Sequence, residues 1–385
     1  MFVNSRNPRG KRYIILIIVV VILLILTIIW FLFGQYLLPL KKASFSQEYI
    51  DQNQGQVSVV VPEVYELANV IIAITDYGID DPFRVYKEGD YYKEVIDHFS
   101  PFRDHPLISK LNLSDARFDL YIRFRENSFA YRFEGDKIIP HETYKIVQIP
   151  NWFEKYREDV EDFARESEFR QFYEDHEDFY LEQAGTYLER VPVRKMWEWL
   201  EDRFPQDISS YKVVFSPLIG ASHTTTKYKT EDFIEVVMFI AGPDFFSAAP
   251  NEIENLLLSR LIFTEIDHNY VNPVTEEYLG SVKDAFSDLG VWNQQNSYRS
   301  AEMTFNEYMT WGLADVYLFE QSSSEAYERY KEVTNQTMIE SRGFVQYDVF
   351  SKKLLELYQN QVNEKSIPDL YPSIIEWAER TINQD

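Results

Sequence analysis

The chain contains no cysteine among its 385 residues. This absence excludes disulfide bonds and zinc sites built on thiolates, so a metal site would have to use histidine, aspartate or glutamate. Histidine is itself scarce, with 6 residues in the chain. A phosphate-binding P-loop, a dinucleotide-binding glycine fingerprint, a nucleophile elbow and internal repeats are also missing, so none of these patterns assigns a function.

Positive charge is scarce as well, because 38 basic residues face 62 acidic ones and the formal net charge is -24. A body this acidic repels a phosphate backbone, which argues against nucleic acid as a partner. The chain is 45% hydrophobic and 16% aromatic, a composition typical of a globular protein with a sizeable core. Basic residues in the first 42 positions, where no acidic residue occurs, are Arg6, Arg9, Lys11, Arg12, Lys41 and Lys42.

Residues 13–33 form an unbroken apolar run that contains one threonine. Its length is close to the roughly 20 residues that span a bilayer, and it exceeds the usual signal-peptide core. We therefore expect an uncleaved, single-pass membrane anchor, with residues 1–12 as a cytoplasmic tail and 34–56 as a linker. The basic residues before the run place the N-terminus in the cytoplasm and the rest of the chain outside it.

The body predicts an α+β fold, with a mixed N-terminal region at 57–185 and a largely helical region at 186–385. The expected strands are 57–61, 211–219 and 233–240, with a polar connection between the last two and a hairpin over 118–139 that turns at Glu126. The expected helices include 63–78, 91–99, 187–204, 302–319, 324–339 and 344–362.

A helix over residues 251–273 carries the strongest chemical signal. Asn251 and Glu254 form a capping box at its start, and Pro273 predicts its end, because the residue before proline avoids the helical conformation. Glu265 and His268 are three residues apart and therefore lie on one helix face.

Residues 264–268, with the sequence TEIDH, resemble the H-E-x-x-H helix of zinc metallopeptidases, in which two histidines bind zinc and the glutamate is the general base. Glu307 lies on a later expected helix, where a gluzincin places its third zinc ligand. Further matching stretches are VPEVYELANVIIAITDYG, YYKEVIDHFSPFRDHP, FARESEFRQFYEDH, FSPLIG and FTEIDHNYVNP.

On these stretches, most of residues 57–320 resemble the bacterial domain of unknown function 4932 family, predicted gluzincin-like metallopeptidases. The resemblance implies a zincin fold, with a mixed sheet over the motif helix, an edge strand along the substrate cleft and a helical C-terminal part. It also implies zinc as the cofactor, Glu265 as the general base, and His268 and Glu307 as zinc ligands.

Thr264 stands where the motif has its first histidine, and a neutral hydroxyl is a poor zinc donor. His223 is the one substitute ligand that the sequence offers near the expected cleft. Three hypotheses follow. The protein is a membrane-anchored, catalytically impaired or inactive metallopeptidase relative whose cleft binds peptide or protein, or an active zinc peptidase with a non-standard ligand set, or a non-enzymatic envelope interaction module. We favour the first, because the scaffold is kept while a ligand is lost.

Overall fold

The computed structural model describes residues 41–81, 83–112, 118–146, 150–246, 251–295, 298–361 and 366–382. The expected tail, the anchor at 13–33 and the first part of the linker lie outside these ranges. Within them, no helix combines the length and the apolar composition needed to cross a membrane.

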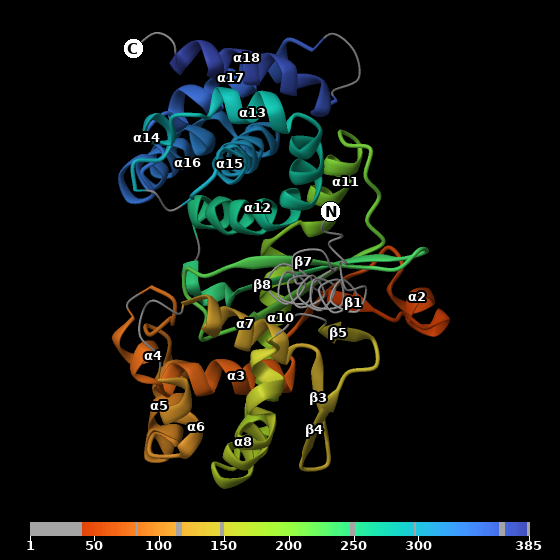
Figure 1. Cartoon of the computed structure of the whole chain (residues 1–385), viewed down its shortest axis with the longest axis vertical. Helices are drawn as coiled ribbons and strands as arrows, with labels where there is room; N and C mark the ends of the chain where they lie inside the picture. The colour runs from red at the N-terminus through yellow and green to blue at the C-terminus, as the bar shows by residue number, and fades with distance from the viewer. Residues whose placement is uncertain are drawn as a thin grey trace, which may run out of the picture.

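A four-stranded mixed sheet lies at the centre of the molecule, in the order β2-β6-β8-β7 (Figure 1). Neighbours β2, β6 and β8 are parallel, whereas β7 pairs antiparallel with β8 and forms one edge. The bounds are β2 Val57–Val60, β6 Ser210–Ser216, β7 Thr224–Lys229 and β8 Ile234–Ala241. The α+β class is thus confirmed. The sequence predicts only a polar connection between β6 and β8, and this prediction is wrong. Three threonines and Tyr228 form the strand β7 there.

One face of the sheet is covered by helices from the first half of the chain (Figure 1). Helix α3 is buried along almost its whole length, because it packs against α5, α7 and β6. The helices of this half are α2 Gln47–Asn53, α3 Glu63–Ile74, α4 Asp76–Asp80, α5 Asp90–Phe99, α6 Pro106–Leu111, α7 Phe118–Ser128, α8 Trp152–Glu166, α9 Phe169–Asp175 and α10 Glu177–Arg190. Helix α11 Val193–Glu201 follows them and packs against α12, on the other side of the sheet (Figure 1). The single helix expected over 187–204 is wrong, because the chain becomes extended at Val191, before Pro192.

The hairpin expected over 118–139 is wrong in its first half, which forms α7. Leu120, Tyr121 and Phe124 are buried there at helical spacing, although Leu120 and Phe124 also fit an alternating strand pattern. The hairpin lies further along the chain, between β3 Tyr131–Glu134 and β4 Lys137–Pro140. It turns at Gly135, whose φ of 57° suits a residue without a Cβ.

Residues 41–56 are part of the fold, so the expected linker over 34–56 is wrong for this portion. Strand β1 (Lys41–Ala43) pairs with β5 (Tyr144–Ile146), and α2 follows it. The Tyr49 hydroxyl, on α2, donates a hydrogen bond to Glu235 on β8 at 2.8 Å. Glu235 is 1% exposed and also accepts a bond from the Tyr144 hydroxyl at 2.5 Å. This buried polar cluster attaches the segment to the sheet.

The other face of the sheet is covered by helices of the C-terminal half, as the sequence predicts (Figure 1). They are α12 Glu252–Glu277, α13 Leu279–Ala285, α14 Leu289–Trp292, α15 Ala301–Gln321, α16 Ser324–Gln336, α17 Tyr347–Gln359 and α18 Tyr371–Ile382. Helix α12 contacts β7 and β8 on one side and α15 on the other. Since β2 comes from the first expected region and β6 to β8 from the second, both regions build one sheet.

Helix α12 begins as predicted, with the Asn251 side chain accepting bonds from the backbone of Ile253 and Glu254. The predicted end at Pro273 is wrong, because the helix continues to Glu277. Proline removes the N–H that would bind the carbonyl of Asn269, one turn earlier. That carbonyl instead accepts a hydrogen bond from Lys227 Nζ of β7 at 3.2 Å. A side chain of the sheet therefore satisfies the group that the proline frees.

Candidate functional site

A cavity of about 790 Å³ lies between β7, α12 and α15. It is lined by all the site residues that the sequence predicts, namely Thr264, Glu265, His268, Glu307 and His223. The other lining residues used below are Thr224, Thr225, Phe245, Arg260, Tyr298, Trp311 and Arg342. Sequence positions far apart along the chain thus meet in one cleft.

Helix α12 presents one face to the cavity. Arg260, Thr264 and His268 line it and are spaced four residues apart, as the helical repeat requires. Thr224 and Thr225 line the cavity from the start of β7, the edge strand. The cleft is therefore bounded by a helix face and a strand edge.

His268 and Glu307 approach each other where α12 packs on α15. His268 Nε2 lies 3.6 Å from Glu307 Oε1, and His268 Nδ1 lies 3.4 Å from the Asn272 side-chain oxygen. The fold thus brings these two residues together. Glu307 lies inside α15, which begins after its cap Ser300.

Arg342 binds the same carboxylate. Its Nη2 lies 2.8 Å from Glu307 Oε2 and donates a second bond to the Tyr298 hydroxyl at 2.5 Å. Burial alone would lower the pKa of Arg342, but Glu307 and Tyr298 outweigh burial and raise it. Arg342 is thus a permanent cation beside Glu307.

The backbone around Arg342 fixes this position. The residue follows a π-helical turn, Thr337–Ser341, and precedes Gly343, whose φ is 74°. A Cβ at Gly343 would lie 2.8 Å from the Gln295 backbone nitrogen, so only glycine fits. This turn brings the guanidinium into the cleft.

Glu265 lies half-buried in the cleft beside these charges. Burial, followed by the nearby Glu307 carboxylate, raises the pKa of its carboxyl to about 8, although Arg342 partly opposes the shift. The carboxyl is therefore mostly protonated at pH 7. A general base must be ionised to accept a proton, and the protein groups around Glu265 by themselves favour the neutral form.

The donors in the cleft do not complete a zinc site. A catalytic zinc generally takes three protein ligands, and the cleft offers His268 and Glu307, of which Glu307 is already paired with Arg342. The Thr264 hydroxyl donates to the Leu261 carbonyl at 3.0 Å. Over the described ranges, no third His, Asp or Glu brings a donor atom within 4.8 Å of both. No catalytic step through zinc follows from this arrangement.

His223, the candidate substitute ligand, lies just before β7. Burial, followed by the positive charge of Arg125, lowers the pKa of its imidazole to about 3, so the ring is neutral. Its Nε2 atom is buried and has no hydrogen-bond partner among the described residues. His223 is therefore available to a ligand in the cleft, but it does not join His268 and Glu307 around one point.

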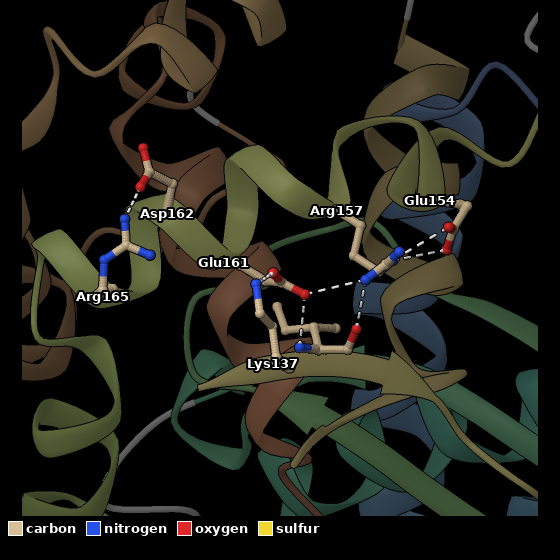
Figure 2. Close-up of polar contacts among 7 residues, drawn as sticks. Lys137, Glu154, Arg157, Glu161, Asp162 and Arg165 are labelled. Atoms are coloured by element: carbon tan, nitrogen blue, oxygen red, sulfur yellow. Dashed lines mark hydrogen bonds and ion pairs between the residues drawn. The ribbon is translucent and has the colours of Figure 1, made fainter. Parts of the chain in front are cut away.

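A second group with metal-ligand chemistry lies far from the cleft, at His105, Asp162 and Glu166. His105 Nδ1 accepts a bond from the Leu107 backbone at 3.2 Å, which puts the hydrogen of the neutral ring on Nε2. Nε2 then faces Asp162 Oδ2, at 3.4 Å, with a hydrogen rather than a lone pair. Figure 2 shows that Asp162 also binds Arg165. This group caps and pairs helices and offers no ready metal site.

No protein-family model, curated protein or solved structure matches the chain. The geometry of the cleft therefore carries the functional argument.

The sequence did not reveal the cations of the cleft. Arg260 could have been found, because it precedes Thr264 by one helical turn and shares its face. Arg342 could not, since it lies on an irregular segment that only the packing of α15 and α16 brings to Glu307.

Proposed function

We propose that the chain is a zincin-like pseudo-peptidase, whose cleft binds a peptide or protein segment without cutting it. The ion pair between Arg342 and Glu307 carries this proposal. An arginine there neutralises the carboxylate that the family resemblance assigns to zinc. Thr264 stands in place of a second zinc ligand. Of the three zinc ligands that the resemblance implies, only His268 is therefore neither replaced nor paired with a cation.

Three features of the fold support the zincin resemblance. The mixed sheet lies over the motif helix α12, its edge strand β7 lines the cleft, and α15 supplies Glu307. The resemblance implies each of these features. They support the gluzincin arrangement as the origin of the cleft.

The edge strand supports an extended peptide as the ligand. Strand β7 is hydrogen-bonded to β8 as the last strand of the sheet, and Thr224 and Thr225 line the cavity. An extended peptide can add to such an edge through its backbone, while pockets hold alternate side chains. Phe245 and Trp311 provide aromatic surface in the same cavity for such side chains.

The anchor remains part of the proposal. Residues 13–33 would hold the protein in the membrane by one helix, with the cleft on the extracytoplasmic side. Protease added to intact cells should then degrade the body, whereas a cytoplasmic control protein survives. Protection of the body until the membrane is broken would reverse this topology.

Restoring the zinc site tests the proposed origin of the cleft. Thr264→His alone should bind zinc weakly, because Arg342 still occupies Glu307. Adding Arg342→Met should raise zinc content towards one ion per chain, since three ligands then face one point. A matched double variant with His268→Ala in place of Thr264→His should bind none. If the restored variant folds and binds no zinc, the zincin geometry itself is wrong.

A further inference from the structure

Arg260 is a buried cation on the wall of the cleft. It lies on α12, one turn before Thr264, and is 8% exposed. Its side chain lines the cavity together with Trp311 and Arg342. None of the roles discussed above uses it.

The contacts of Arg260 leave most of its hydrogen-bonding capacity unused. Nη1 donates to the Thr334 hydroxyl at 3.2 Å, and the buried Nε has no partner. A guanidinium carries five N–H donors. Among the described residues, no carboxylate lies within ion-pair distance of it, whereas nearby Arg342 and Lys331 pair with Glu307 and Asp315 at 2.8 and 2.7 Å.

Trp311 holds the guanidinium in a fixed place. Arg260 lies 4.4 Å from the Trp311 ring centre, and Arg342 lies 4.6 Å from it. Stacking on an indole is favourable for a guanidinium and leaves its in-plane N–H groups available. The result is a preorganised donor plane on the cavity wall.

A buried charge without an opposite partner destabilises a fold, and burial also lowers the pKa of Arg260. The chain has 62 acidic residues, yet none of the described ones forms an ion pair with this guanidinium, and the Asp315 carboxylate, which acts on it from further away, is itself paired with Lys331. The missing partner can come from a ligand in the adjoining cavity.

We infer that Arg260, held by Trp311, binds a carboxylate group of the peptide ligand. The inference rests on the proposed function and adds the chemical class that the cleft selects. A planar carboxylate matches the guanidinium fork. A phosphate dianion fits less well, because Glu307 and an acidic body repel the additional charge.

The carboxylate can be the C-terminus of a peptide or the side chain of an aspartate or glutamate. A mixture of acetylated hexapeptides, half with a free C-terminus and half amidated, separates the two sources. The full-length chain in detergent is immobilised, and the retained peptides are identified by mass spectrometry. Enrichment of free C-termini or of internal acidic residues then identifies the source.

The wild-type chain should enrich carboxylate peptides about tenfold over neutral ones, as expected for a charge-assisted hydrogen bond in a partly dry site. Arg260→Met should abolish this preference while still retaining neutral peptides, which shows that the cleft is intact. Arg329→Met, a control that removes an exposed arginine of α16, should keep the preference.

Enrichment of peptides without a carboxylate preference overturns the inference and leaves the proposed function standing. Retention of no peptide overturns both. If Arg260→Met does not fold, Arg260→Lys is the variant to measure. Lysine keeps the positive charge but lacks the paired N–H donors that bind both oxygens of a carboxylate. A preference reduced several-fold in that variant supports the inference, and an unchanged preference contradicts it.

Discussion

Glu265 is a carboxyl group that the surrounding protein holds largely in its neutral form. It is enclosed by protein, near a second carboxylate, and burial is the largest cause of its raised pKa. In an active site, a metal ion would offset these effects by favouring the ionised form. Here Arg342 offsets them only in part. The residue that would perform the chemistry is thus kept largely neutral.

This raised pKa predicts how Glu265 affects stability. Between pH 4.5 and about 8 the unfolded chain releases a proton from Glu265 that the folded chain keeps. The contribution of Glu265 to the free energy of unfolding therefore falls as pH rises, and above pH 8 the ionised side chain destabilises the fold by its full amount. Glu265→Gln should therefore stabilise the protein at pH 8.5 by roughly 1 to 3 kcal/mol and by little at pH 4.5.

Urea unfolding of both proteins at the two pH values measures the difference. Glu252→Gln, at an exposed position on the same helix, is the control and should show no such pH dependence. An equal effect of Glu265→Gln at both pH values would mean that the carboxyl is not held neutral by the fold.

Helix α12 illustrates how tertiary contacts change the limits of an element. Pro273 indicates a helix end in the sequence, yet Lys227 from β7 binds the Asn269 carbonyl that the proline frees. The Asn269 amide also reaches Thr225 on the same strand, at 3.3 Å. These bonds connect the motif helix to the edge strand, so they also determine the width of the cleft.

Lys227→Met should therefore destabilise the protein by about 1 kcal/mol, because a carbonyl near the core loses its partner. In a Pro273→Ala background the new N–H can bind that carbonyl, so the same lysine change should cost less. A double-mutant cycle by chemical denaturation measures the coupling. Lys229→Met, at an exposed position on the same strand, is the control and should show no coupling to Pro273→Ala. If Lys227→Met destabilised the protein equally in both backgrounds, the role given to Lys227 would be contradicted.

The local sequence pattern predicted an element correctly where it fitted only a helix or only a strand, and it misled where it fitted both. Asn251 and Glu254 predicted the start of α12, which is confirmed, because a capping box is a local interaction. Leu120 and Phe124 fitted both a strand and a helix, and packing against α3 and α8 selected the helix. The TEIDH motif predicted the cleft, but the position of Arg342, which pairs with Glu307, depends on long-range packing.

At the scale of the whole molecule, residues 41–56, which follow the expected anchor along the chain, are attached to the rest of the fold. Phe45 packs on Phe233 with ring centres 4.8 Å apart, and Tyr49 reaches Glu235. Lys212 Nζ donates to the Tyr49 hydroxyl at 2.8 Å. A body attached in this way is positioned close to the membrane if residues 13–33 span it.

Truncations test this attachment. A chain that begins at Lys41 should unfold at the same temperature as one that begins at Gln35, whereas a chain that begins at Val57 should unfold several degrees lower. The shorter chain loses Tyr49, one of the hydrogen-bond partners of Glu235, and uncovers Phe233. Differential scanning calorimetry of the three proteins gives the comparison. Equal midpoints would show that residues 41–56 act only as a tether.

If the cleft has exchanged zinc chemistry for peptide binding, the full-length chain should hold little zinc. The protein is purified without chelators, equilibrated with zinc and measured by mass spectrometry beside His268→Ala. We expect far less than one zinc per chain in both proteins. About one zinc per wild-type chain that is lost in His268→Ala would contradict this expectation and would indicate an active peptidase with a substitute ligand.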